Sequence, residues 1–459
     1  ECSIATDHFV VTVKTDNSGQ SSDTQFTIPT TGSGYNYNVD CDNDGINEGS
    51  GVTGDFTCDY AAPGTYTIRI KDTLGDGMSF PRIYFYGIKD EQKLLSVDQW
   101  GTGKWTSMEF AFADCINLEV NAVDAPDLSG VTSMSGMFNN AQSLNQDLSS
   151  WSTGNVTDMS ALFANATTFN QPIGTWDTSN VTDMNYMFSN AADFNQDINA
   201  WDTANVTNME GLFADATDFN QPLGSWDVSS VTILSGMFAN ATAFDQLINA
   251  WDTSSVTKMD GVFLNAVSFN QGLSNWDTGN VTDMWQMFKG ATTFDQAIGN
   301  WNTVKVTTME SMFAGAAAFD QELGSWDTSG VTDMDSMFAG AVTFDRDLST
   351  WDVGNLTTAD AMLDGVNLSI ANYDALLIAW DAQNLQSNVT FDGGDSHYCL
   401  ATDERQNMID TDLWTITDGG RYCTVPSDDF VITVSGDSFT IPTNPLETYD
   451  YNVDCDNDG

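Results

Sequence analysis

Histidine and basic residues are scarce in this chain of 459 residues. It has two histidines, and 13 lysines and arginines stand against 65 aspartates and glutamates, so the formal net charge is −52. His8 and His397 lie in separate parts of the chain, no cysteine stands near a plausible base, and no glycine-rich phosphate loop is present. We therefore expect no catalytic centre. Because so acidic a surface repels nucleic acid and anionic membranes, we expect neither as a partner.

Long apolar runs and a leader segment are also missing. No stretch of 18 residues is apolar enough for a transmembrane helix, so we expect no membrane insertion. The sequence begins at Glu1 without a signal peptide, and we expect it to be a processed or excerpted piece. Only 17% of the residues are charged and 41% are hydrophobic, which excludes a disordered acidic tail.

What the sequence does contain is a repeat of 25 residues without insertions. A period between 20 and 50 residues is typical of arrays in which each repeat stacks on the one before it. The repeat is marked by nine equally spaced tryptophans: Trp151, Trp176, Trp201, Trp226, Trp251, Trp276, Trp301, Trp326 and Trp351.

The apolar residues within one repeat follow a helical spacing. From Met184 onward they fall at i, i+3, i+4, i+7 and i+10, which predicts one face of a short helix. Thr182 stands where an N-cap belongs. Residues 196–201 are too few for a helix and are expected to be extended. The pattern thus predicts a short strand and a short helix in each repeat, with the strands forming a parallel sheet along one side.

The repeat motif V-T-D-M-x-x-M-F-x-x-A-x-x-F-N-Q-x-I-x-x-W-D, as in residues 156–177, resembles the BspA-like leucine-rich-repeat surface proteins. The similarity is to their 25-residue variant, common in bacterial surface proteins and mycoplasma lipoproteins, and it covers residues 100–365. The resemblance implies a leucine-rich-repeat-like α/β solenoid on the cell surface, often adhesive, and it implies no catalysis.

Residues 1–99 alternate apolar and polar residues between turn signals. Several short strands of this kind predict a β-sandwich. The stretch Tyr60–Ile68 is similar to part of PKD-type immunoglobulin-like domains. The expected strands centre on residues 9–13, 35–41, 56–60, 66–70 and 83–85.

The last part of the chain leaves the 25-residue period. Residues 366–423 predict helix, strand, helix and strand, and we expect them to cap the array. Residues 424–459 repeat the beginning, since Phe430–Val434 echoes Phe9–Val13. Cys423 then corresponds to Cys2, and Cys455 to Cys41. We expect the chain to be one module of a longer tandem protein, followed by the start of another.

The cysteines fall into two expected pairs. Cys41 and Cys58 have the inward phase of their strands, which favours a disulfide, although two buried thiols would fit the same pattern. Cys399 and Cys423 are expected to pair across the cap, and Cys115 to remain a buried free thiol. Disulfides would indicate an oxidising, extracellular location.

An acidic loop in residues 40–51 is the candidate metal site. It matches the first half of a calcium loop, D-x-D-x-D-G, but its twelfth residue is Gly51 rather than glutamate. A polar hairpin with Asx turns is the alternative. A second candidate, Asp72 with Asp76, is weaker. The expected calcium ligands are the carboxylates of Asp40, Asp42, Asp44 and Glu48 and the carbonyl of Ile46.

Four polar and aromatic positions recur in most repeats. The Asp that follows seven of the nine repeat tryptophans is expected to cap its own turn, with a cation-binding edge as the alternative. The Asn-Gln pairs, such as Asn195-Gln196, suggest a hydrogen-bonded ladder. The Trp residues are expected to form a stacked core rather than an exposed glycan platform. The Thr residues at position 182 and its equivalents could instead form an ice-binding rank.

These patterns together predict a non-catalytic, extracellular module of a long tandem-repeat bacterial surface protein that mediates adhesion. The expected partners are neighbouring modules of the same protein and a host or cell-surface protein or glycan. The alternative is a structural subunit of an extracellular stalk or filament whose modules contact each other.

Overall fold

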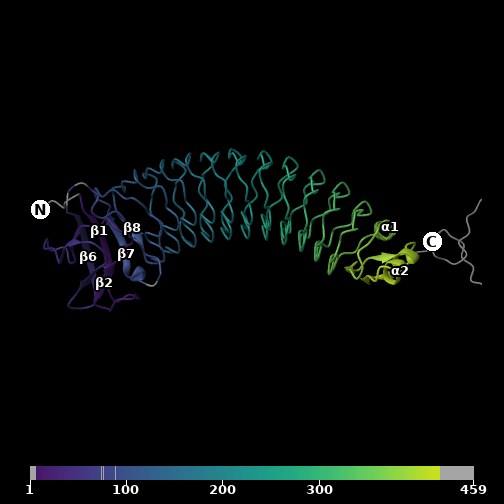
Figure 1. The fold of residues 1–459 in the computed structure, drawn as a ribbon, viewed down its shortest axis with the longest axis horizontal. Coiled ribbons are helices and arrows are strands. Elements are labelled where there is room, and N and C mark those ends of the chain that lie inside the picture. The colour runs from purple at the N-terminus through teal and green to yellow at the C-terminus, as the bar shows by residue number, and fades with distance from the viewer. Residues whose placement is uncertain (1–6, 74, 76, 88, 424–459) are drawn as a thin grey trace, which may run out of the picture.

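The computed structural model describes residues 7–73, 75, 77–87 and 89–423. These residues form a curved rod (Figure 1). A β-rich region lies at the N-terminal end, stacked coils fill the middle, and two short helices lie at the C-terminal end. The predicted copy in residues 424–459 falls outside the described residues.

The N-terminal β region consists of two sheets. The larger has the order β4-β3-β6-β1-β7-β8, and β2 pairs with β5 in the smaller one. Strands form at four of the five predicted runs, whereas residues 83–85 form no strand, although Ile83 and Phe85 are buried. An immunoglobulin-like or PKD-type identity stays a prediction. The strands are β1 (Phe9–Lys14), β2 (Gln25–Ile28), β3 (Tyr37–Asp40), β4 (Gly49–Val52), β5 (Phe56–Asp59), β6 (Thr65–Asp72), β7 (Leu94–Gln99) and β8 (Glu119–Val120), with a 3₁₀ turn at Glu91–Lys93.

The coil array grows directly from the edge of this larger sheet. β7 pairs antiparallel with β1 on one side and parallel with β8 on the other. Each later coil then pairs with the next through a single-residue parallel bridge, as in Asp158 to Asp183 and Asp183 to Asn208. The bridges run without a break from Ser133 to Thr358, so backbone pairing is continuous along the rod.

The prediction of a leucine-rich-repeat-like α/β solenoid is wrong. All of residues 121–369 are described, and they contain no helix and no strand longer than one bridge residue. The expected strand at residues 196–201 is absent, and pairing occurs instead at position 183 and its equivalents. The repeats are stacked coils built from consecutive turns.

Two residues with positive φ in each coil explain why no helix forms. In one coil they are Ala161, with φ 50°, and Asn165, with φ 59°. Left-handed residues interrupt a right-handed helix. The backbone N–H of Ala161 therefore donates to the backbone carbonyl of Asn185 in the next coil, at 2.8 Å. In an α-helix it would donate to the carbonyl four residues earlier. The helical spacing of the apolar residues arises from two successive turns.

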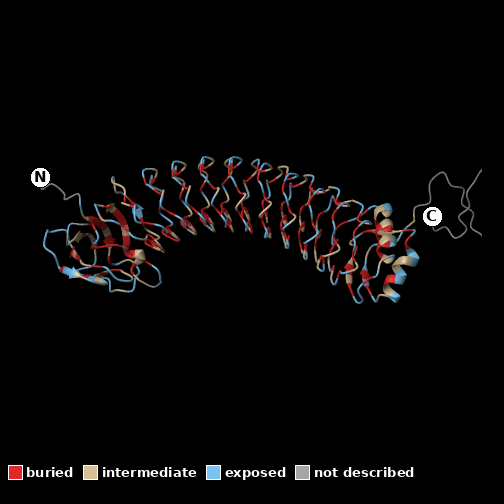
Figure 2. Ribbon diagram, turned by 45° about the horizontal axis from the view of Figure 1, so that its top comes forward, coloured by how far each residue is buried: buried red, intermediate tan, exposed pale blue. Residues whose placement is uncertain are grey.

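Aromatic columns fill the interior of the array. Phe188 stacks on Phe213 with ring centroids 5.7 Å apart, and Trp201 stacks on Trp226 at 6.4 Å. The repeat tryptophans are at most 5% exposed, which confirms that they belong to the core. Each indole from Trp176 to Trp351 donates to a carbonyl 28 residues earlier, for example Trp201 Nε1 to Ile173 at 3.1 Å. Buried and exposed segments consequently alternate along every coil (Figure 2).

The C-terminal region continues these columns with different elements. Phe391 bridges Ala359 of the last coil, and Trp380 Nε1 donates to the carbonyl of Leu348 at 3.3 Å. The helices lie where the sequence predicts them. No helix in the described part of the chain is long and apolar enough to cross a lipid bilayer. The elements are α1 (Ile370–Asp381), β9 (Thr390–Asp392), β10 (His397–Tyr398), α2 (Thr402–Asp410), β11 (Thr415–Thr417) and β12 (Gly420–Arg421).

Candidate functional site

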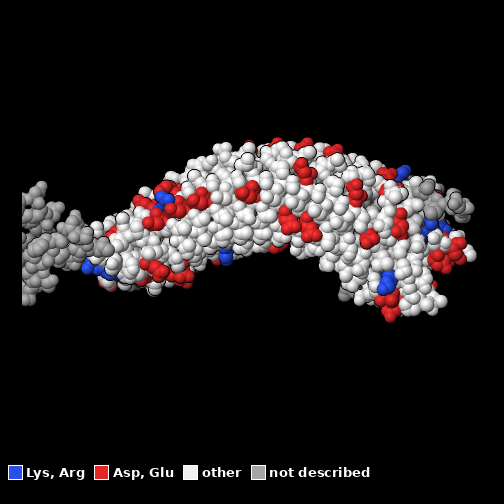
Figure 3. Space-filling view, turned by 180° about the vertical axis from the view of Figure 1, so that it is seen from behind, with Lys and Arg blue, Asp and Glu red and all other residues white. Residues whose placement is uncertain are grey.

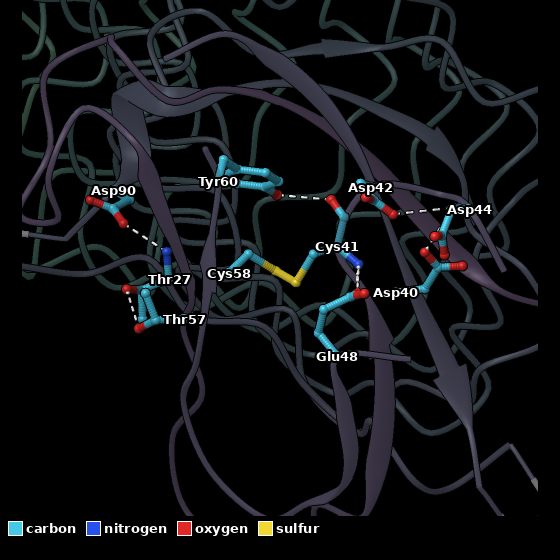
Figure 4. Close-up of a disulfide and its surroundings, with 10 residues drawn as sticks. All are labelled: Thr27, Asp40, Cys41, Asp42, Asp44, Glu48, Thr57, Cys58, Tyr60 and Asp90. Atoms are coloured by element: carbon cyan, nitrogen blue, oxygen red, sulfur yellow. Dashed lines mark hydrogen bonds between the residues drawn. A yellow bond between two sulfur atoms is a disulfide. The ribbon is translucent and has the colours of Figure 1, made fainter. Parts of the chain in front are cut away.

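The acidic loop joins β3 to β4 and is organised by Asp40 at the end of β3. This side chain is fully buried, and its carboxylate accepts the backbone N–H groups of Asp44 at 3.2 Å and Gly45 at 3.1 Å. Asp44 in turn accepts the N–H of Ile46 at 2.7 Å. These are the Asx-type contacts of a polar turn, and they hold the loop in one conformation (Figure 4).

Three of the five predicted calcium ligands come together in this loop. Oxygen atoms of Asp40, Asp42 and Glu48 lie within 4.8 Å of one another, whereas the carboxylate of Asp44 does not belong to the group. Carboxylate oxygens are the donors that calcium prefers. The ammonium of Lys71 lies 3.1 Å from Asp40 Oδ2, so it already neutralises one of these carboxylates. The donor set therefore fits a divalent cation only in part.

A disulfide fixes the base of the same loop. Cys41 and Cys58 are bonded, with Cα atoms 5.7 Å apart, which ties the loop to β5 (Figure 4). Glu48 accepts the N–H of Cys41 at 2.6 Å, and the hydroxyl of the half-buried Tyr60 donates to the carbonyl of Cys41 at 2.9 Å. Burial raises the pKa of Tyr60, so this hydroxyl remains a donor. Loop, strand and disulfide thus form one rigid unit.

The second predicted disulfide and the free thiol are also present. Cys399 and Cys423 are bonded, with Cα atoms 4.9 Å apart. Cys115 is a buried free cysteine, and desolvation raises the pKa of its thiol well above the usual value. A thiol that stays protonated is a poor nucleophile, so Cys115 is part of the core packing.

Of the weaker candidate metal site, Asp72 with Asp76, the structure describes only Asp72. Asp72 accepts the backbone N–H of Gly77 and the hydroxyl of Ser79, so its carboxylate closes its own loop. Asp76 lies outside the described residues. Asp72 therefore serves as a turn residue in the part of this loop that the structure describes.

The aspartates that follow seven of the nine repeat tryptophans cap their own turns, as expected. Asp177 Oδ1 accepts the hydroxyl of Ser179 at 2.6 Å and its backbone N–H at 3.1 Å. These two hydrogen bonds, the hydroxyl first, lower the pKa of Asp177. The same contact to the residue two positions on recurs at Asp227 and Asp327. This column of aspartates therefore stabilises a turn within each coil and makes no contact between coils in these hydrogen bonds.

The Asn-Gln pairs form the predicted ladder. Asn170 Oδ1 accepts the backbone N–H of Asn195 at 3.0 Å and the side-chain amide of Gln196 at 2.7 Å. The threonines behave differently from the prediction, since Thr182 caps no helix. Its hydroxyl donates to the carbonyl of Thr157 in the preceding coil, at 3.1 Å. Both columns are therefore contacts between coils.

Two adjacent columns, which the sequence analysis did not identify, differ from coil to coil. Their members range from exposed side chains at Tyr186, Trp285 and Asp360 to buried residues at Gly211, Ser235, Gly261 and Ser311. We call them the variable face. It includes Tyr186 and Trp285, whose side chains are each 40% exposed. The signal was present in the sequence, because these positions differ from coil to coil between nearly invariant neighbours. The columns comprise Ser160, Asn185, Glu210, Ser235, Asp260, Trp285, Glu310, Asp335 and Asp360, and Ala161, Tyr186, Gly211, Gly236, Gly261, Gln286, Ser311, Ser336 and Ala361.

A family model matches this chain. A family model described as a Mycoplasma protein of unknown function, DUF285, matches residues 83–175, 106–223, 170–276, 215–303 and 261–380. None of the curated proteins compared with the chain matches it. The five overlapping segments run from residue 83 to residue 380, which is more than half of the chain and includes the whole array of tryptophan repeats. The chain therefore belongs to the DUF285 family of tandem-repeat proteins.

Proposed function

We propose that this chain is a non-catalytic, extracellular module of a long bacterial surface protein and that it mediates adhesion through the variable face. The family match supports a repeat-built surface protein. The two disulfides support an oxidising location outside the cell. The resemblance to the BspA-like surface proteins, which are often adhesive, supports the role itself.

The observation that carries the proposal is the contrast between the constant and the variable columns. Constant positions are occupied by side chains that build the rod, such as Trp201 in the core and Asn170 in the ladder. The second column of the variable face keeps a positive φ in every coil, but its side chains differ, and the face presents two large aromatic side chains, Tyr186 and Trp285, to solvent. Exposed Tyr and Trp, with apolar rings and a polar group, are common in binding sites for proteins and sugars.

The test compares binding of the purified chain and its variants to whole cells. We expect the double variant Tyr186→Ala with Trp285→Ala to lose roughly tenfold or more in affinity, as for two central interface aromatics. Leu247→Ser is the matched control, because Leu247 is 69% exposed on a different column. Equal binding by the double variant and the wild type would remove the variable face from the mechanism, and absence of wild-type binding would end the adhesion proposal.

A structural role in a stalk or filament is the second candidate. It is favoured by the recurrence of residues 9–13 as residues 430–434, since repetition of a whole module produces a long protein, as a stalk or filament requires. In that case the surfaces between modules, rather than the variable face, would carry the function.

We further propose that the loop of Asp40, Asp42 and Glu48 binds calcium and stiffens the N-terminal β region. The proposal is supported by the short distances among the three carboxylates and by the disulfide that fixes the loop. Lys71 weakens the site, because its ammonium competes with the cation for Asp40.

A further inference from the structure

The chain is held firmly on the C-terminal region up to Cys423. β12 pairs parallel with β10, and the N–H of Tyr422 donates to the carbonyl of Tyr398 at 2.8 Å. The disulfide to Cys399 comes at the next residue. The described chain is therefore fixed to the C-terminal region up to Cys423, its last described residue.

Three exposed apolar side chains belong to residues near this disulfide, and we call them the exit patch. They are Ile378, Leu400 and Tyr422, which are 42%, 59% and 54% exposed. Leu400 directly follows Cys399, and its backbone N–H donates to the carboxylate of Asp374, one helical turn before Ile378. Tyr422 directly precedes Cys423. Such a group of apolar side chains on a polar surface is typical of an interaction site.

The sequence beyond the exit repeats that of the N-terminus. Residues 423–430 correspond to residues 2–9, with the same seven-residue spacing from cysteine to phenylalanine. Phe9 is the first residue of β1 and is 5% exposed in the core of the β region. Seven residues span at most about 25 Å. The β region of a second copy must therefore begin close to the exit patch.

We propose that the exit patch is the docking surface for the N-terminal β region of the following copy of this module. We further propose that the disulfide between Cys399 and Cys423 holds the joint between the two copies covalently. Cys423 holds the place of Cys2 in the following copy, so the disulfide links the C-terminal region of one copy to the first residues of the next. The inference rests on the tandem arrangement in the proposed function, and it makes the joint rigid rather than a hinge. Two modules joined by a flexible link without a docked surface would move independently.

The test uses a chain of two copies, in which residues 1–423 are followed directly by residues 3–459. This preserves the spacing from cysteine to phenylalanine at the joint. Electron microscopy of single particles gives the distribution of angles between the two rods. We expect one narrow distribution for the wild-type joint. The double variant Leu400→Ser with Tyr422→Ser should give a distribution at least roughly twofold wider.

Leu413→Ser is the matched control, because Leu413 is 55% exposed and lies beyond the far end of α2 from Leu400. It should keep the narrow distribution. A wide wild-type distribution, or a narrow one in the double variant, would overturn the docking proposal. The measurement requires no cell binding, so a rigid joint without adhesion would contradict only the proposed function, and adhesion with a loose joint would contradict only this inference. Disulfide mapping and a melting curve confirm that each variant is folded.

Discussion

At the scale of single residues, the oxygen of one side-chain amide joins two coils. Asn170 Oδ1 accepts hydrogen bonds from the backbone of Asn195 and the side chain of Gln196. Only the acceptor matters there, because aspartate, which cannot donate when ionised, replaces asparagine in other coils and makes the same contacts. Asp245 and Asp295 make both contacts, whereas Asp320 accepts from Asp345 and Arg346, and Asp345 accepts from Ser369 and Asn372.

We therefore expect Asn170→Ala to lower the free energy of unfolding by about 1–3 kcal/mol, because two half-buried donors lose their partner. Asn170→Asp is the control and should cost less than about 1 kcal/mol, since the acceptor is kept. Urea denaturation of the whole chain measures both. Equal losses for the two variants would show that the ladder contact contributes little and that packing alone holds neighbouring coils together.

At the scale of elements, the sequence predicted which residues of a coil are buried but indicated the wrong backbone. The 25-residue period and the apolar positions follow from the pattern, because burial requires the same residues in a helix or in successive turns. The backbone depends on φ, and the sequence signal for φ is a recurring glycine. Gly211, Gly236 and Gly261 recur in the middle of the expected helix, and each has φ between 57° and 60°. Glycine repeated at one helical position indicates a left-handed residue rather than a helix.

The C-terminal helices and both disulfides were predicted because their signals are local. Residues 402–410 form α2 as expected, and Cys41, directly after β3, bonds to Cys58 of β5 in the other sheet, both with the buried phase of their expected strands. The acidic loop was predicted only in part. Its spacing placed Asp44 among the ligands, but the side chain of Asp44 accepts the N–H of Ile46 instead. The position of Lys71 depends on the pairing of β3 with β6, which the sequence of the loop does not contain.

The acidic loop leads to a prediction at the same scale. We expect millimolar calcium to raise the melting temperature of the chain by a few degrees, since ligand at a hundred times its Kd adds about 2.7 kcal/mol to the stability of a site. Asp42→Asn should abolish the rise, whereas Asp44→Asn, outside the group of three carboxylates, should retain it. If the wild-type melting temperature is the same in calcium and in chelator, calcium does not stabilise this protein and the proposed site is wrong.

At the scale of the whole molecule, charge and shape favour single threads over bundles. The net charge is −52, and acidic side chains are spread over the rod with few basic ones between them (Figure 3). Like-charged surfaces repel each other unless salt screens them. Both ends of the array are covered, by the β region and by the C-terminal region, so the coils themselves offer no open end for stacking.

We therefore expect electron microscopy of native material sheared from cells to show unbundled threads that bend at a constant interval, each ending in a distinct tip. Each bend would reflect one curved rod (Figure 1). Threads of this form support a stalked adhesin, because the variable face then remains open to a partner along the whole length. Regular fibres with neighbouring rods packed side by side at moderate salt would favour the filament instead, since contacts between modules must then outweigh the repulsion of their acidic surfaces.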